Sequence, residues 1–122
     1  METSLISQWL DEREKQSIAE KQLEELLKRT NHLTLSEYYA LYQLNRHGSR
    51  MRQNDLGNYL CLSQSALSRL IDRLEQKEPQ LIGKKTCTDD KRGVYIGITT
   101  AGKNLLTSIE KDVDVILKEY FS

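Results

Sequence analysis

The sequence contains too few cysteines and too few long apolar segments for several large classes of protein. Its two cysteines, Cys61 and Cys87, cannot build a disulfide framework and are not a close-spaced metal pair. No apolar run approaches the ~20 residues that a membrane span needs, and the first residues lack the basic-then-apolar pattern of a signal peptide. We therefore expect a cytoplasmic protein without a membrane partner.

Motifs of catalysis and of cofactor binding are also missing. The sequence has no glycine-rich phosphate loop and no recognisable pair of a nucleophile and its base. His32 and His47 fall in predicted loops and have no third ligand at a suitable spacing, which argues against a metal site. We expect a protein that is not an enzyme and that needs no cofactor, and a small-molecule inducer stays an open question.

Net charge is absent from the whole chain but not from its parts. The 122 residues include 18 Lys and Arg and 18 Asp and Glu. Residues 46–92 hold ten basic and six acidic side chains, whereas residues 1–45 hold five and eight, and residues 93–122 hold three and four. A basic excess confined to the middle is the pattern expected when one module meets a polyanion.

Helical periodicity accounts for most of the first 46 residues. Thr3 or Ser4 is expected to cap a long helix that runs to about Arg29. A second helix, with Ser36 as its cap, is expected to run to about Arg46, where residues 47–49 end it. Some combination of four of its side chains is expected to be buried: Tyr39, Leu41, Tyr42 and Leu44.

The next 30 residues predict two helices joined by a tight turn. A short helix from Gln53 to Leu60, with Leu56 and Leu60 inward, is followed by a turn at residues 61–62, and Gly57 is expected to allow another backbone to approach. Ser63 then caps a helix that runs to about residue 76. Its inward positions follow helical spacing, and they are Leu67, Leu70, Ile71 and Leu74. Its outward positions are Gln64, Ser65, Ser68, Arg69, Asp72 and Arg73.

Residues beyond Pro79 predict a β-hairpin and a last helix. Residues 81–88 and 93–99 are rich in β-formers and are joined by a short charged connection. Thr99 or Thr100 is expected to cap a helix that ends near Tyr120. The predicted fold class is mainly α with a small β-hairpin, a winged helix-turn-helix with long N- and C-terminal dimerisation helices. We expect a dimerisation helix in residues 1–32, a DNA-binding domain in 33–99 and a dimerisation helix in 100–122.

A helix-turn-helix followed by a basic hairpin is typical of DNA binding. The helix after Ser63 can enter the major groove, where amide, hydroxyl and guanidinium groups read base edges, and the hairpin can approach the backbone or the minor groove. The expected DNA-binding residues are Ser63, Gln64, Ser65, Ser68, Arg69, Arg73, Lys84, Lys85, Lys91 and Arg92. An ordinary solvated helix face with local ion pairs is the alternative for Arg69, Asp72 and Arg73. Asp90 is expected to orient Arg92 for DNA, the alternative being a salt bridge only.

Four segments have an order and spacing that are specific in combination. They are residues 33–38, 52–56, 62–75 and 90–94 continuing to 98–102. From about Leu33 to Leu106 the chain resembles the MarR family of bacterial regulators. The resemblance implies a homodimer on a pseudo-palindrome of double-stranded DNA, with Arg92 in the minor groove and with interlocking first and last helices. The residues expected to form the dimer contacts are Leu5, Ile6, Trp9, Leu10, Ile109, Val113, Ile116, Leu117 and Tyr120.

Two features depart from the family pattern. The usual Lys-Gly step before the wing is replaced by Lys77 followed by residues 78–80, Glu-Pro-Gln, which leaves the placement of the wing open. The sequence also stops at Ser122, where many members continue with another helix, so the dimer contacts are expected to come from the first and last helices present.

Two further signals have a functional and a structural interpretation. Aromatic residues could line a ligand crevice of the kind that the resemblance implies, although helical spacing is more typical of a plain core. These residues are Trp9, Tyr38, Tyr39 and Tyr42. Oxidation of Cys61 could shift the helix that follows it, but a small buried apolar cysteine is favoured because no activating cation is identifiable, and Cys87 is similar.

We therefore expect a sequence-specific transcriptional regulator, more specifically a repressor, because occupying an operator is the simplest action open to so small a protein. The alternative is a winged-helix module that binds protein, an anti-regulator or adaptor, which the zero net charge keeps open.

Overall fold

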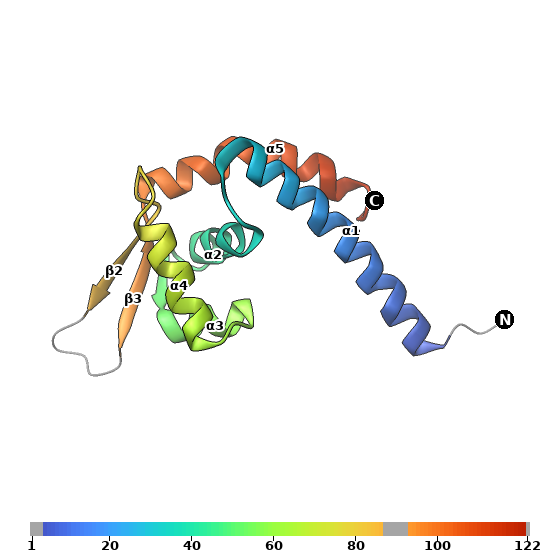
Figure 1. Ribbon diagram of the computed structural model, residues 1–122, viewed down its shortest axis with the longest axis horizontal. Helices are drawn as coiled ribbons and strands as arrows, with labels where there is room; N and C mark the ends of the chain where they lie inside the picture. Colours follow the sequence, from blue (N-terminus) through green and yellow to red (C-terminus); the bar gives the residue numbers. More distant parts are fainter. Residues whose placement is uncertain (1–3, 87–92, 122) are drawn as a thin grey trace. The chain divides into compact units, whose positions relative to one another are not determined.

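The structure is a computed structural model that describes residues 4–86 and 93–121. Figure 1 shows its elements in chain order. In the described residues these are α1 (Leu5–Asn31), α2 (Leu35–Arg46), β1 (Arg50–Arg52), α3 (Gln53–Leu60), α4 (Gln64–Glu75), β2 (Ile82–Thr86), β3 (Val94–Ile98) and α5 (Thr100–Lys118). The chain divides into two compact units, one of residues 1–35 and 110–122 and the other of residues 36–109.

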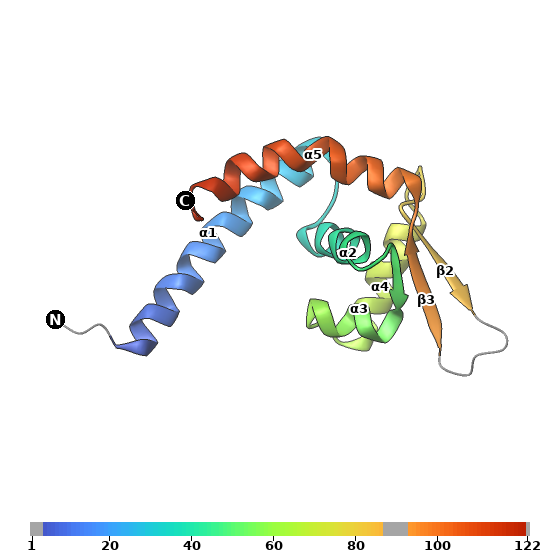
Figure 2. The same cartoon turned by 180° about the vertical axis from the view of Figure 1, so that it is seen from behind.

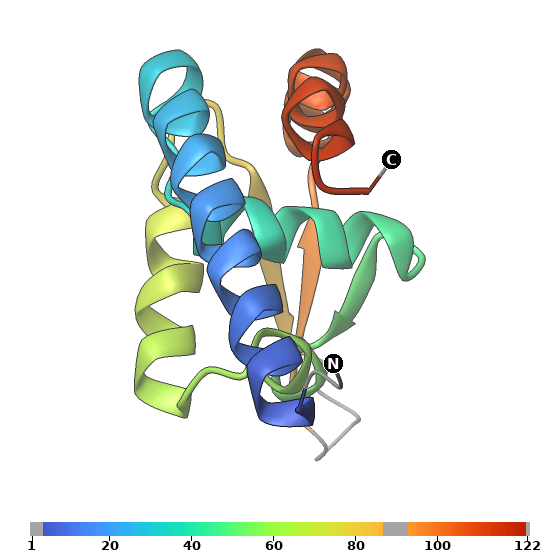
Figure 3. The same ribbon diagram turned by 90° about the vertical axis from the view of Figure 1, so that its right-hand side faces the viewer.

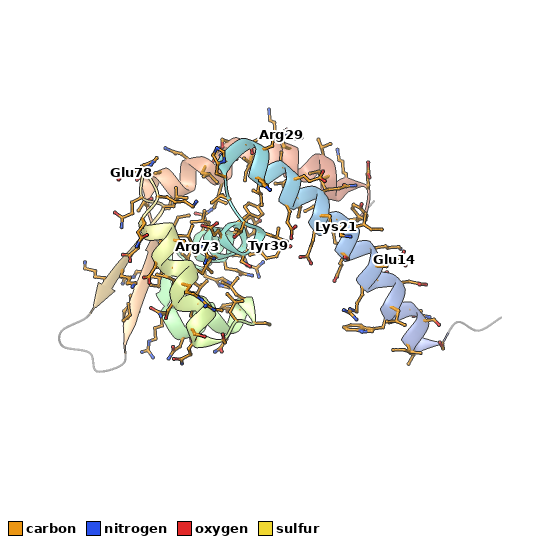
Figure 4. All side chains as sticks on the ribbon, in the orientation of Figure 1. Glu14, Lys21, Arg29, Tyr39, Arg73 and Glu78 are labelled. Carbon is orange, nitrogen blue, oxygen red and sulfur yellow. The ribbon has the colours of Figure 1, made fainter. Side chains whose placement is uncertain are left out.

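The first unit is dominated by α1, a helix of 27 residues. Ser4 is its N-cap, because its side chain accepts a hydrogen bond from the Ser7 backbone N–H at 3.2 Å. The buried side chains of α1 come only from its C-terminal half, and they are Ala19, Leu23, Leu26 and Leu27. Figure 4 shows charged side chains, among them Glu14, Lys21 and Arg29, along the length of this helix. The long first helix and its cap are therefore confirmed.

The second unit begins with α2, whose start differs from the sequence prediction. The helix begins at Leu35, so Ser36 lies in its first turn and is not the cap. Leu41 and Leu44 are fully buried, but Tyr42 is 49% exposed, because the inward face of α2 continues through Tyr38 instead. Of the four side chains from which the buried set was expected, Leu41 and Leu44 are the buried ones.

A buried ion pair joins the start of α2 to the loop after α4. Glu37 is only 2% exposed, and its Oε2 lies 3.6 Å from the Nζ of Lys77. A carboxylate is removed from water at a high free-energy cost unless an opposite charge accompanies it. Lys77, at the point where the chain departs from the family pattern, therefore supplies an opposite charge beside the buried side chain of Glu37.

A three-stranded antiparallel sheet lies beside these helices, in the order β1-β3-β2. Figure 3 shows β3 between the other two strands, and Figure 2 shows the same strands from behind. Only two strands were expected from the sequence, and β1 is a third that corrects this prediction. Met51 of β1 pairs with Ile96 of β3 and both are buried, so β1 closes the core side of the sheet.

The predicted apolar stripe of α4 faces this core. Leu67, Leu70, Ile71 and Leu74 are all buried, together with Ile82 and Ile96 of the sheet. Each such side chain contributes roughly 1.5–3 kcal/mol of hydrophobic stabilisation. The inward face of α4 is therefore fixed by packing, and its opposite face is turned away from the core.

The connection from α4 to the sheet is held to the start of α5. Figure 4 labels Glu78 in this connection, which contains a cis Glu78–Pro79 bond. Thr99 donates a hydrogen bond to the Gln80 carbonyl at 2.6 Å and accepts one from the Gly102 N–H at 3.1 Å, which makes Thr99 the cap of α5. Despite the departure at residues 78–80, β2 pairs with β3 in a continuous register.

Within the part of the chain that the structure describes, no helix is long and apolar enough to cross a membrane.

Candidate nucleic-acid interface

The turn between α3 and α4 depends on two residues with unusual roles. Cys61 adopts the left-handed conformation at φ 55°, where it ends α3 and donates its backbone N–H to the carbonyls of Asn58 and Gly57. Gly57 is buried, and a Cβ at this position would lie 2.9 Å from Leu67 Cδ2. The close neighbour of Gly57 is thus a side chain of α4, not another backbone. These contacts hold α3 and α4 together as a helix-turn-helix.

Ser63 begins α4 as predicted. Its Oγ accepts a hydrogen bond from the Ala66 backbone N–H at 3.2 Å and lies 3.4 Å from the Oγ of Ser65. The remaining N–H groups of the first turn point away from the helix, together with the positive end of its dipole. The start of α4 therefore offers polar hydrogen atoms and two hydroxyl groups at one exposed end.

The outward face of α4 is formed by the residues that the sequence predicted. All of them are exposed: Gln64, Ser65, Ser68, Arg69, Asp72 and Arg73. Figure 4 shows Arg73 on this helix. In the described residues no ion pair engages Arg69 or Arg73, so the alternative of a face held by local ion pairs has no support for these two arginines. Both guanidinium groups are available to an anion.

Lys84 of β2 is bound to α4. Its Nζ lies 3.1 Å from Asp72 Oδ1 and 3.6 Å from Glu75 Oε1, and its backbone N–H donates to Glu75 Oε2 at 3.3 Å. The hydrogen bond that Lys84 donates to Asp72 raises the pKa of the Lys84 ammonium above its ordinary value of 10.5, and Glu75 adds to the effect. The ammonium group of Lys84 therefore ties the wing strand to the helix, a contact that the sequence analysis did not foresee.

The other predicted wing residues divide between the described and the undescribed parts of the chain. Lys85 is exposed and, being next to Lys84 in a strand, lies on the opposite face of the sheet. Asp90, Lys91 and Arg92 lie outside the described residues, as does Cys87. The structure brings together the α4 residues and places Lys84 against them, while the tip of the predicted hairpin stays a prediction.

The environment of Cys61 corrects one prediction. Its side chain is exposed, not buried, and its Sγ lies 3.8 Å from the Asn58 carbonyl oxygen. The left-handed cap conformation turns this residue out of the core, which the preference of cysteine for buried positions did not reveal.

The four aromatic residues of interest do not share one environment. Tyr38 is buried, with its ring centroid 6.1 Å from that of Tyr39 and 6.2 Å from that of Tyr42. Trp9 belongs to the other unit and is 63% exposed. For Tyr38 the plain core interpretation holds.

Two arginines of β1 are basic residues that were not among the predicted site residues. Arg50 and Arg52 each place the guanidinium carbon 5.9 Å from the centre of the Tyr95 ring, and Arg52 Nε donates to the Tyr95 hydroxyl at 3.4 Å. The signal was present as an Arg-Met-Arg triplet, in which alternation puts both arginines on one face if the segment is a strand.

A helix-turn-helix with an exposed polar second helix, followed by a strand pair bound to that helix, defines the winged helix-turn-helix class of DNA-binding proteins. The MarR family model matches residues 33–94, just over half of the chain. The chain belongs to the MarR family.

Solved structures of transcriptional regulators agree with this assignment. AbsC, a MarR family transcriptional regulator from Streptomyces coelicolor, is 26% identical, with 99% of this chain and 82% of AbsC covered at a TM-score of 0.81. Sco3205 from the same organism, determined in complex with DNA, is 23% identical, with 98% and 75% covered at a TM-score of 0.80. MepR, a regulator of the Staphylococcus aureus multidrug efflux pump MepA, is 20% identical, with 98% and 83% covered at 0.75. The latter two show the shared fold.

Proposed function

We propose that the protein is a homodimeric transcriptional repressor that binds a pseudo-palindromic operator, with α4 of each subunit in the major groove. The observation that carries this proposal is the exposed face of α4, where Gln64, Ser68 and Arg69 stand opposite a fully buried apolar stripe. A helix of this kind can enter the groove without loss of its packing against the core.

The residues of α4 divide by their distance from the start of the helix. Gln64, Ser65, Ser68 and Arg69 lie in its first two turns, where a recognition helix meets base edges, and Arg69 can donate two hydrogen bonds to guanine. Arg73 lies one turn farther and suits a phosphate. The capped start at Ser63 suits a second phosphate, because its free N–H groups and the helix dipole favour an anion.

Lys84 supports the proposal as a positioning residue. Since its ammonium is engaged by Asp72 and Glu75, it fixes the wing strand relative to α4. In this role Lys84 aligns the wing with the groove next to the one that α4 occupies, and Lys91 and Arg92 supply the wing's charges to that groove.

The N-terminal part of α1 supports dimerisation. Leu5, Ile6, Trp9 and Leu10 are each more than half exposed. Large exposed apolar side chains gathered on one helix segment are costly in water and mark an interaction surface. A second copy of α1 would cover them, and the symmetric dimer would present two α4 helices to the two halves of a pseudo-palindrome.

In-vitro selection from random duplexes, followed by gel shift, tests the proposal. The selected sequences are expected to contain a palindrome, and binding is expected to weaken steeply with salt. Arg69→Ala should relax the preference at one base position of each half-site, at a cost of about 1–3 kcal/mol, whereas Arg73→Ala should weaken binding to all sequences alike.

Two outcomes would reject the proposal. If no duplex is enriched at low salt, the winged helix serves a protein partner instead. If enriched duplexes are bound with unchanged specificity by the Arg69→Ala variant, α4 does not read the bases. A reporter gene placed behind the selected site distinguishes a repressor from an activator.

A further inference from the structure

The strand register sorts the side chains of the sheet onto two faces. Met51, Ile96 and Lys84 are partners across the three strands and face α4 and the core. By alternation, the residues next to them face the opposite way. The outer face, as we define it, consists of two cross-strand rows: Arg52, Tyr95 and Lys85 in one, and Arg50, Gly97 and Gly83 in the other.

The first row and Arg50 make the outer face cationic and leave it partly open to solvent. Arg50 and Lys85 are exposed, and among the described residues no ion pair engages either of them. The guanidinium groups of Arg50 and Arg52 lie near the Tyr95 ring, each 5.9 Å from its centre. An arginine that is already oriented by an aromatic ring loses less side-chain entropy when it binds an anion.

The second row leaves the sheet backbone open at Gly83, beside these cations. Gly83 and Gly97 are direct partners in the ladder, and a Cβ on Gly83 would meet no atom within 4 Å. Neither glycine has a positive φ, so the backbone conformation does not require glycine at either position. Glycine weakens a strand, and it often marks a place where a ligand or another backbone comes close.

We propose that the outer face of the sheet is a second DNA-binding surface, which holds the phosphate backbone of the duplex on the far side of the wing from α4. This inference rests on the proposed function, because β2 and β3 are the strands that bring this face to the DNA. The ligand is the phosphodiester backbone, bound through its charge and its access to the uncovered strands, without reading of bases.

The spacing of the cations favours an extended polyanion over a single anion. Arg50 and Arg52 belong to β1 and Lys85 to β2, which are separated by β3, so the strands that carry the charges lie roughly 10 Å apart. A DNA duplex carries about one negative charge per 1.7 Å of its axis, so one duplex can contact the cations of β1 and of β2 at the same time.

The composition of the face argues against a protein partner. Half-buried Tyr95 is the one large apolar side chain of the two rows. A protein interface needs a desolvated core of aromatic and aliphatic groups, whereas a backbone-binding surface needs cations, polar groups and space. The outer face has the cations, polar groups and open space of a surface that binds the DNA backbone.

Duplex length tests the proposal directly. The selected site is prepared in two forms, one trimmed to the recognised palindrome and one with about ten additional base pairs on each side, one helical turn. The double variant R50Q/K85Q is expected to bind the long duplex about tenfold more weakly and to lower the salt slope by about 2, since each lost phosphate contact removes ~0.9. Its affinity for the trimmed duplex should change less than twofold.

Two further variants separate charge from fold. G83D and G83N place side chains of equal size in the open space over the strands, and only Asp adds a negative charge. G83D should bind the long duplex at least tenfold more weakly than G83N, with equal thermal stability of the two. K103Q, which removes one charge from an exposed position of α5, should bind both duplexes as the parent protein does.

Hydroxyl-radical footprinting gives a second readout. Protection of the backbone outside the palindrome is expected for the parent protein and should be lost in R50Q/K85Q. The proposal is overturned if that variant weakens both duplexes equally, or if it weakens neither. Failure of the parent protein to bind any selected duplex would instead overturn the proposed function, so the two failures are distinguishable.

Discussion

Lys84 and Lys85 are adjacent lysines with opposite surroundings. Lys84 is held by Asp72 and Glu75, while Lys85 is exposed on the other face of the strand. The residue type does not predict this difference, but the position of each lysine in the alternating strand does. Lys84 is two residues from buried Ile82, so alternation alone puts it on the core side.

Replacement of Lys84 by Met should weaken DNA binding without a change in its salt slope, because a positioning residue releases no counterions. On the long duplex, Lys85→Met should lower that slope by about 1. Gel shift over a range of salt concentrations measures both. An equal drop in slope for the two variants would show that Lys84 contacts phosphate itself.

The ion pair between Lys84 and Asp72 predicts a pH dependence of the free energy of unfolding. The pKa of Lys84 is raised by folding, so its contribution is fully present below 10.5, its ordinary pKa, and is lost as the pH rises through the higher folded value. Because the lysine side chain is 38% exposed, this contribution is small, about 1 kcal/mol or less. The stability difference between the parent protein and Lys84→Met, measured by denaturant unfolding, should therefore shrink above pH 10.5.

Gly102 lies in the first turn of α5, at a position where a side chain has no room. A Cβ at this position would lie 2.6 Å from the Leu81 carbonyl oxygen and 2.6 Å from Ile98 Cγ1. Gly102→Ala should destabilise the protein by roughly 1–3 kcal/mol, since the oxygen belongs to the backbone and cannot move alone. Gly83→Ala, with open space around it, should stay within about 0.5 kcal/mol of the parent. Denaturant unfolding compares the two, and an equal effect would contradict the structure.

At the scale of the element, Ser63 has an observed role and a proposed one that one substitution can separate. It caps α4 through the Ala66 N–H, and in the proposed function it lies where a phosphate approaches. Ser63→Ala should cost about 1 kcal/mol of stability. Ser63→Asp retains a capping oxygen, so the protein should keep its stability while DNA binding falls by more than tenfold, because the carboxylate repels phosphate. Thermal unfolding and gel shift of the same samples decide the matter: retained affinity in Ser63→Asp would remove this site from the interface.

The helices could be predicted from the sequence because their signals are local. The buried stripe of α4 repeats with helical spacing, and Ser63 and Ser4 are typical caps. The three-residue strand β1 could not be predicted, because it is defined by pairing with β3, more than 40 residues away in the chain. For the same reason Arg50 and Arg52, which β1 adds to the outer face of the sheet, were absent from the predicted site.

Predictions of burial were right where packing decides and wrong where a cap or a turn decides. Leu67, Leu70 and Ile71 are buried by helical spacing. Cys61 and Ser36 were misplaced, because the left-handed cap exposes the cysteine and the helix begins one residue before the serine. Such ends depend on single hydrogen bonds, which residue preferences describe only on average.

At the scale of the whole molecule, the exposed residues of α1 predict a symmetric assembly. Leu5, Ile6, Trp9 and Leu10 are spaced as one face of a helix, and Leu5 is 83% exposed in the single chain. Two DNA-binding units joined in one dimer gain affinity from the high effective concentration of the second after the first has bound. Loss of the dimer should thus cost DNA affinity without any change in α4.

Trp9→Lys should convert the proposed dimer to a monomer in sedimentation experiments, because it places a charge in an apolar interface. It should also weaken binding to the selected palindrome by about 100-fold. Gln8→Lys adds the same charge on a neighbouring face of α1 and should leave both assembly and binding unchanged. Binding to a single half-site should be nearly equal for the two variants, since each keeps one intact α4. A Trp9→Lys protein that stays dimeric would place the interface elsewhere. A monomer that binds the full palindrome as tightly as the parent would show that the two halves act independently.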